Sequence, residues 1–202
     1  MIKAIIFDVG GVLHNDLRDY LKNDITSTLG ISEKAHDQFF KKYDEMLSIG
    51  KISEKDFWEL FVRGTKAVKP LPKDSLFVRE FDKNYKIFND VIDLVRRLKK
   101  NGYKVAILSN TIKSHADVNI KKGAYDEFEI KILSYEVGFR KPDEQIYMLA
   151  LRRLNVKSEE AVFIDDNPKM VKGANAVGIF GIVFESYKKL VTDLKTLGIR
   201  LN

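Results

Sequence analysis

Five short runs of apolar residues recur along the chain, and polar or glycine residues follow them. They occupy residues 4–7, 105–108, 130–133, 161–164 and 179–184. Continuous apolar runs of this length are typical of strands that are buried on both faces, as in a parallel sheet. After residue 86, segments with apolar residues at helical spacing separate the runs. This alternation of strands and helices predicts right-handed βαβ units in an α/β layer fold.

Residues 15–85 break the alternation, because no strand pattern is evident there. Apolar residues recur at helical spacing in three places, namely Leu17, Tyr20 and Leu21, then Phe39, Phe40, Tyr43 and Leu47, then Phe57, Leu60 and Phe61. Ser53 suits the N-cap of the third helix. We therefore expect an α/β core of residues 1–14 and 86–202, and an all-helical insert of residues 15–85. Phe57 and Trp58 are expected to pack inside the insert rather than line a substrate pocket.

Composition and charge exclude several classes of protein. The chain has 202 residues and no cysteine, so disulfides, thiolate metal sites and cysteine nucleophiles are excluded. Its 35 basic and 29 acidic residues give a net charge of +6, but the basic residues are dispersed, which argues against a nucleic-acid partner. The first apolar run is too short for a signal peptide, and no segment has the ~20 apolar residues that span a bilayer. We expect a cytoplasmic protein with no membrane partner.

Polar side chains gather where the predicted strands end. Asp8 follows the first run, Ser109 the second, and Asp165 and Asp166 the fourth, while Lys141 follows the third after a short segment. The carboxyl ends of parallel strands meet at one edge of a sheet, which is where open α/β folds bind ligands. Any one of the Asp or Ser residues alone is readily explained as a helix N-cap. The combination instead predicts a site at which all five converge.

Three converging carboxylates require a counter-charge. At ~4–5 Å and an effective dielectric of ~20, each pair repels by roughly 3–4 kcal/mol. A hard divalent cation with oxygen ligands offsets this repulsion, and Mg²⁺ suits a site that has few carboxylates and a phosphate ligand. Ser109 adds a hydroxyl and Lys141 a positive charge. The set therefore predicts a phosphate pocket beside a magnesium site.

Four motifs, in this order, resemble those of the haloacid dehalogenase (HAD) superfamily. They are FDVGGVL at residues 7–13, ILSNT at 107–111, RKP at 140–142 and FIDDN at 163–167. The helical insert resembles the cap of the subgroup whose cap follows the first motif, which includes sugar-phosphate phosphatases and the phosphatase domain of soluble epoxide hydrolases. The resemblance implies a Rossmann-like parallel sheet with helices on both faces and a small helical cap after strand one.

The resemblance also implies roles for residues in the phosphate pocket. Asp8 would be the nucleophile that forms an aspartyl-phosphate. Ser109 would hydrogen-bond the phosphoryl group, with Asn110 and Gly10 also in the phosphate-binding set. Lys141 would stabilise the charge of the phosphoryl group and of Asp8. These assignments come from the motifs and not from spacing alone.

The same resemblance implies a Mg²⁺ cofactor. Asp8, Asp166 and the backbone carbonyl of Gly10 would ligate the ion, and Asp165 would support it through water. The chain departs from the family pattern at Met170, where related sequences often carry a polar residue that supports this loop. That departure affects the surroundings of the metal more than its ligands.

A second departure is Gly10, where most family phosphatases have an Asp that acts as general acid and base. Losing a general acid typically costs ~10²–10⁴ in rate. A leaving group that needs little protonation suffers less, as in sugar-1-phosphates, acyl phosphates or aryl phosphates. His14 lies near the start of the insert, and a solvated or hinge position is expected for it rather than a role as substitute proton donor.

The expected function is a Mg²⁺-dependent phosphatase that acts on a small phosphorylated metabolite. One alternative is a 2-haloacid dehalogenase, but the pair Asp165 and Asp166 argues against it because those enzymes use no metal. Another is a catalytically silent regulator that keeps phosphate or partner binding, which Gly10 and Met170 allow. No residue in the sequence indicates the physiological substrate or the oligomeric state.

Overall fold

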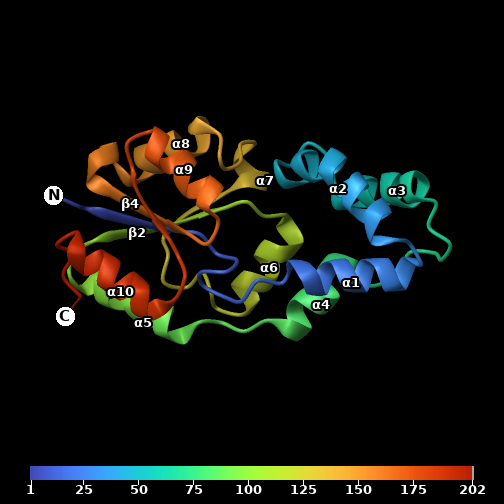
Figure 1. Ribbon diagram of the computed structural model, residues 1–202, viewed down its shortest axis with the longest axis horizontal. Helices are drawn as coiled ribbons and strands as arrows, with labels where there is room; N and C mark the ends of the chain where they lie inside the picture. The colour runs from blue at the N-terminus through green and yellow to red at the C-terminus, as the bar shows by residue number, and fades with distance from the viewer. Residues whose placement is uncertain (202) are drawn as a thin grey trace.

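The structure is a computed structural model that describes residues 1–201. Its sheet has five parallel strands in the order β3-β2-β1-β4-β5 (Figure 1). The strands are β1 (Ala4–Phe7), β2 (Lys104–Ser109), β3 (Ile130–Leu133), β4 (Ala161–Asp165) and β5 (Phe180–Val183). All five predicted strands are therefore confirmed, with ends that differ by at most one residue. β1 lies at the centre, paired with β2 on one side and β4 on the other.

The helices of the core cover both faces of the sheet. They are α5 (Asn89–Lys100), α6 (Lys113–Lys121), α7 (Ser134–Val137), α8 (Glu144–Leu154), α9 (Pro168–Ala176) and α10 (Tyr187–Thr196), with a 3₁₀ turn at Ser158–Glu160. In Figure 1, α5 and α10 lie on one side of the sheet and α8 and α9 on the other. Within the described residues, no helix combines the length and hydropathy needed to cross a membrane.

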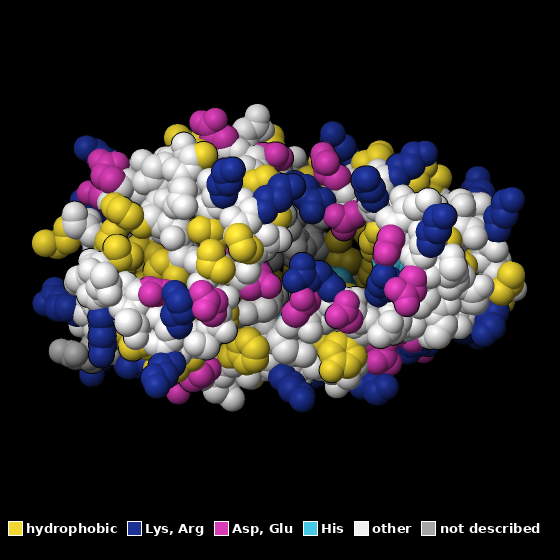
Figure 2. All heavy atoms as spheres, viewed as in Figure 1, with side chains coloured by type: hydrophobic (Ala, Val, Ile, Leu, Met, Phe, Trp, Pro, Cys, Tyr) yellow, Lys and Arg dark blue, Asp and Glu magenta, His cyan; other side chains and the backbone are white. Residues whose placement is uncertain are grey.

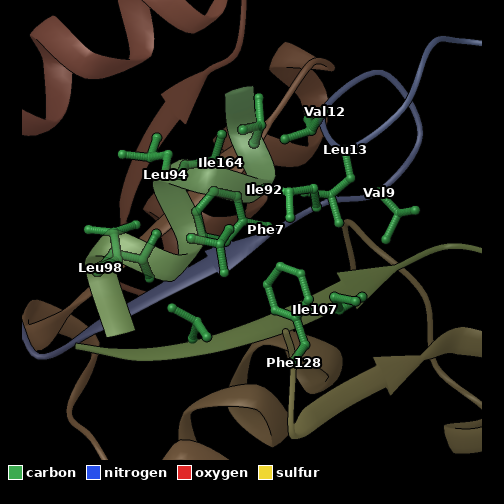
Figure 3. Close-up of a cluster of buried hydrophobic side chains, with 14 of the residues drawn as sticks. Phe7, Val9, Val12, Leu13, Ile92, Leu94, Leu98, Ile107, Phe128 and Ile164 are labelled. Carbon is green, nitrogen blue, oxygen red and sulfur yellow. The ribbon is translucent and has the colours of Figure 1, made fainter. Parts of the chain in front are cut away.

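The two faces of β1 explain why its sequence is apolar throughout. Ile5 and Phe7 pack toward α5 and α10, whereas Ala4 and Ile6 pack toward α8 and α9. Figure 3 shows the first of these clusters, in which Phe7 contacts Phe128 edge-on with ring centroids 5.9 Å apart. Each such side chain contributes roughly 1.5–3 kcal/mol when fully buried. A strand covered on both faces has no polar position to alternate with, so its pattern is continuous.

Four helices form the insert after β1. They are α1 (Arg18–Leu29), α2 (Glu33–Ser48), α3 (Glu54–Thr65) and α4 (Leu76–Asn84), and they gather at one end of the molecule in Figure 1. We call them the cap helices. Ser53 is the N-cap of α3, as predicted, and forms a capping box with Asp56.

Aromatic side chains fill the interior of the cap helices. Phe57 and Trp58 are buried there, as predicted. The Trp58 ring lies 4.6 Å from that of Phe77 and 5.3 Å from that of Phe61, centroid to centroid. The cap helices therefore have a hydrophobic core of their own, separate from the two clusters on the sheet.

The chain crosses between the sheet and the cap helices at two places that lie side by side. Asn15 donates its backbone N–H to the carbonyl of Lys86 at 3.1 Å, and its side-chain oxygen accepts from the Lys86 N–H at 2.8 Å. Next to them, His14 and Ile87 form an isolated antiparallel bridge. We propose that the boundary between core and cap lies at this paired crossing.

Candidate active site

The carboxyl ends of the central strands bring three carboxylates together. Asp8 directly follows β1, Asp165 ends β4, and the Asp8 N–H donates to the carbonyl of Ile164 at 2.8 Å. One carboxylate oxygen each of Asp8, Asp165 and Asp166 lies within 4.8 Å of the others. The convergence predicted from the strand ends is present. The β1–β4 pairing causes it, because this pairing sets the two strand ends level with each other.

Lys141 joins two of these carboxylates. Its Nζ lies 2.7 Å from Asp8 Oδ1 and 2.6 Å from Asp165 Oδ2, and the lysine side chain is only 2% exposed. Asn110 fixes the backbone that presents this lysine: its Nδ2 donates to the Lys141 carbonyl and its Oδ1 accepts from the Lys141 N–H, both at 2.8 Å. The side chain of Asn110 therefore positions Lys141, and Asn110 also lines the adjoining cavity.

The electrostatics of the cluster follow from burial. Burial raises the pKa of Asp8 to about 7, with Asp165 adding to the rise and Lys141 opposing it. Burial and the neighbouring Asp165 also raise the pKa of Asp166. For Lys141 burial lowers the pKa, but the attraction of Asp8 and Asp165 outweighs it, so the pKa is raised. The cluster thus holds three carboxyl groups around one buried ammonium group, which contacts two of them.

The oxygen atoms of the cluster suit a hard divalent cation. Both oxygens of Asp165 are engaged, one with Lys141 and the other with the N–H of Asn167 at 2.8 Å. Within the described residues the Asp166 carboxylate makes no hydrogen bond, and its one ion contact is with Arg18 Nη2 at 3.5 Å. Asp166 is therefore the freer of the two carboxylates, and Asp165 is held in place by its neighbours. The three carboxylate groups could hold a metal ion, and oxygen ligands of this kind suit a hard cation such as Mg²⁺.

Gly11 allows Asp166 to approach the first loop. Its φ of 81° lies in the left-handed region, and a Cβ at this residue would come within 2.6 Å of Asp166 Oδ2. A side chain at residue 11 would thus displace the carboxylate. The glycine permits the close approach of the loop after β1 to the end of β4.

A cavity of about 560 Å³ extends from the carboxylates toward the cap helices (Figure 2). Ser109, which is 4% exposed, reaches it from the end of β2. Met170 also lines it, and its backbone carbonyl accepts a hydrogen bond from Tyr147 Oη at 2.7 Å. Every residue predicted for the site lines this cavity: Asp8, Gly10, Ser109, Asn110, Lys141, Asp165 and Asp166.

His14 is buried rather than solvated, and it lies at the paired crossing between the sheet and the cap helices. Its side chain is buried between the rings of Phe81 and Tyr85, with centroids 5.4 and 4.5 Å away. Its Nδ1 lies 2.7 Å from the carbonyl oxygen of Asn15. Two aromatic residues from the end of the insert thus cover a histidine at its start. The residues are far apart in the sequence, so the sequence alone does not indicate this contact.

Two arginines line the cavity, and the sequence analysis predicted no role for either. Arg18 begins α1 and places its guanidinium between Asp16 and Asp166. Arg140 donates from Nη1 to Asp44 Oδ2 and Ser48 Oγ in α2, both at 2.8 Å. Arg140 stood inside a recognised motif, but its partners lie more than 90 residues away. No local signal in the sequence identifies such a contact.

The chain is similar to several known proteins. The chain is 28% identical over 192 residues to the glyceraldehyde 3-phosphate phosphatase of Methanopyrus kandleri, a match that covers 89% of this chain and 82% of that protein. It is 26% identical over 192 residues to the pyrophosphatase PpaX of Bacillus thuringiensis, covering 88% and 80%. A HAD-family enzyme of Bacteroides thetaiotaomicron, crystallised with magnesium and inorganic phosphate, shares the fold with a TM-score of 0.76 and 24% identity, covering 94% of this chain and 99% of that one.

The family assignment rests on a match to most of the chain. The family model described as haloacid dehalogenase-like hydrolase matches residues 2–178, a span that contains all four motifs and the whole helical insert. The α/β fold with a central parallel sheet and cap helices, expected from the resemblance, is confirmed. This chain belongs to the haloacid dehalogenase-like hydrolase family.

Proposed function

We propose that the protein is a Mg²⁺-dependent phosphatase that hydrolyses a small organic phosphate monoester through an aspartyl-phosphate on Asp8. The observation that carries the proposal is the placement of Lys141 between Asp8 and Asp165, with Asp166 free to hold a cation beside them. The phosphatase names of two relatives that align over most of this chain support it. Small phosphorylated molecules are accordingly the proposed partners.

The first chemical step uses Asp8 as the nucleophile. One of its carboxylate oxygens forms a bond to phosphorus while the bond from phosphorus to the leaving oxygen breaks, and the leaving oxygen keeps the electron pair. Lys141 neutralises charge on the carboxylate and on the phosphoryl oxygens. The Ser109 hydroxyl donates a hydrogen bond to a phosphoryl oxygen. Asp8, Asp166 and the backbone carbonyl of Gly10 would hold Mg²⁺, which when bound would further neutralise the phosphoryl charge.

The second step regenerates the carboxylate. Water attacks phosphorus, the bond from phosphorus to the Asp8 oxygen breaks, and inorganic phosphate leaves with a proton lost to solvent. Lys141 favours the charged form of Asp8 after release, against the effect of burial. Because residue 10 offers no carboxylic acid, we propose that the enzyme favours leaving groups that need little protonation, a class that includes those of sugar-1-phosphates and of aryl phosphates.

The experiment is a turnover assay on a panel of phosphate monoesters, with and without Mg²⁺. The expected result is hydrolysis that EDTA abolishes and Mg²⁺ restores, and that Asp8→Asn removes. Asp117→Asn, which changes an exposed carboxylate on α6, serves as the matched control and should keep full activity. Hydrolysis that persists in Asp8→Asn would reject the proposed nucleophile. Phosphate binding without any turnover would favour the regulator, and metal-independent release of halide from a 2-haloacid would favour the dehalogenase.

A further inference from the structure

The cavity between core and cap has two chemically different ends. The core end carries the carboxylates and Lys141. The opposite end carries six apolar side chains, all of which come from the cap helices α1, α2 and α4. We call this surface the apolar wall; it consists of Leu21, Ile25, Phe40, Leu47, Phe77 and Phe81. Figure 2 shows hydrophobic side chains in the depth of the hollow, with charged ones around its mouth.

Three polar side chains from α2 that line the same cavity, His36, Asp44 and Ser48, already have partners in the protein. The His36 Nδ1 lies 3.0 Å from Asp37 Oδ1, and its ring stacks on Phe40 with centroids 4.2 Å apart. Burial lowers the pKa of His36, so the ring is neutral near pH 7 and extends the apolar surface. Asp44 and Ser48 are both held by Arg140. A ligand hydroxyl that approached these three side chains would have to compete with the contacts they already make.

We propose that the leaving group of the substrate is apolar and aromatic, so that the enzyme acts on phosphate esters of phenols in preference to sugar phosphates. The inference rests on the proposed phosphatase function and narrows its substrate class. Two separate observations point to it. Gly10 offers no carboxylic acid, which phenolates tolerate as leaving groups. The apolar wall lines the same cavity as Asp8, the proposed nucleophile.

The energetic argument concerns the hydroxyl groups of a sugar. A hydroxyl moved from water to an apolar surface without a new hydrogen bond costs ~1–3 kcal/mol by protein mutational data. An aromatic ring gains instead from burial against Phe40 and Phe81, in edge-on or offset contact. A cavity of about 560 Å³ holds a phosphate with a leaving group of one or two rings.

The test compares 4-ethylphenyl phosphate with 4-(hydroxymethyl)phenyl phosphate. The two have nearly the same size and leaving-group pKa, and they differ by a methyl against a hydroxyl at the far end. We expect kcat/KM to be about 10- to 100-fold higher for the ethyl compound, chiefly through KM. Equal values, or a preference for the hydroxymethyl compound, would overturn the proposal, as would faster turnover of sugar-1-phosphates than of both phenol esters.

A variant locates the selectivity on the apolar wall. Leu21 is only partly buried, so Leu21→Asn changes the chemistry of the wall at nearly constant size. It should reduce the preference for the ethyl compound at least about fivefold, which is part of the range a methyl group controls. Leu197→Asn, the same exchange at an exposed position of the core, should keep the wild-type ratio. An unchanged ratio in Leu21→Asn would show that the wall does not contact the leaving group.

Failure of this inference differs from failure of the proposed function. Each phenol ester is also assayed with EDTA and with Asp8→Asn. If hydrolysis needs Asp8 and Mg²⁺ but proceeds with equal kcat/KM for both phenol esters, the proposed phosphatase function stands and the aromatic substrate class is rejected. Turnover that ignores Asp8 rejects the proposed function itself.

Discussion

The imidazole of His14 lies beside Gly10, so that a Cβ on residue 10 would be 3.8 Å from His14 Cε1. This is an ordinary van der Waals distance. The backbone of Gly10 is also outside the left-handed region that glycine alone adopts freely. Residue 10 therefore has room for a side chain, unlike Gly11, and the general acid that the sequence lacks can be introduced by substitution.

Gly10→Asp is expected to accelerate the hydrolysis of alkyl phosphates. An alkoxide leaves slowly without a proton, and a carboxylic acid two residues from Asp8 would supply one. The gain should reach ~10²-fold for alkyl esters, the low end of general-acid effects, and be small for aryl esters. The measurement is the slope of log(kcat/KM) against leaving-group pKa, which should become shallower in the variant.

Gly10→Ala is the control for this slope, because it fills the same space without an acid. It should keep the steep dependence of the wild-type protein. Parallel slopes in Gly10→Asp and the wild type would mean that another group already delivers the proton, and the assignment of the missing acid to residue 10 would be wrong.

Asp166→Asn is expected to weaken Mg²⁺ binding at least about tenfold while leaving the fold intact. Its carboxylate makes no hydrogen bond within the described chain, so thermal stability should change by no more than ~0.5 kcal/mol. Asp165→Asn should behave differently, because it removes a charged hydrogen bond to Lys141 worth about 1.5–3 kcal/mol. Calorimetric titration with MgCl₂ and thermal unfolding of both variants separate the two roles; equal Mg²⁺ affinity in Asp166→Asn and wild type would reject the ligand assignment.

Mg²⁺ affinity is expected to rise with pH. The pKa of Asp8 is raised to about 7, so below that pH its carboxyl holds a proton that the cation must displace. For one such proton, affinity should increase about tenfold between pH 6 and pH 8 and level off above. Titrations in two buffers of different ionisation enthalpy should also detect proton release near pH 6.5. Affinity that stays constant over this range would contradict the raised pKa.

His115 is expected to make the fold less stable in acid. Burial lowers its pKa to about 4; the ring stacks on Phe81, and its Nε2 lies 3.0 Å from the Phe77 carbonyl oxygen. The unfolded chain takes up a proton near pH 6.5 and the folded one only near pH 4. Stability is thus fully present above pH 6.5 and is lost as pH falls to 4, by up to about 3 kcal/mol. Urea unfolding at pH 7 and pH 5 measures the loss.

His115→Phe keeps the stacking on Phe81 and removes the titrating group. The difference in unfolding free energy between pH 7 and pH 5 should shrink in this variant. It should not vanish, because burial also lowers the pKa of His14 and His36. An identical pH difference in variant and wild type would show that His115 does not contribute.

Much of the fold was predictable because its signals are local. Runs such as 4–7 are apolar throughout since both faces of the sheet are covered, and Ser53 caps its helix through contacts within one turn. The convergence of Asp8 with Asp165 was predictable for a different reason: parallel strands present their carboxyl ends at one edge, so polar residues at two strand ends meet once the strands are neighbours.

The apolar wall of the cavity could not be predicted from the sequence. Phe81 and Leu21 meet through the packing of α1 on α4, and nothing in their spacing distinguishes a cavity-lining side chain from one in the interior of the cap. The contact of Arg140 with Asp44 is likewise set by how the cap helices sit over the sheet. The burial of His14 could not be predicted for the same reason, because the rings of Phe81 and Tyr85 that cover it follow some 70 residues later.

Trp58 provides a spectroscopic handle on the cap. It is the only tryptophan in the chain, and it is buried among the aromatic rings of α3 and α4. Its fluorescence therefore reports on the interior of the cap, whereas circular dichroism reports on helices throughout the chain. If the denaturation curves measured by fluorescence and by circular dichroism coincide, cap and core unfold as one cooperative unit. An earlier fluorescence transition would identify the cap as a separate folding unit that opens while the sheet stays intact.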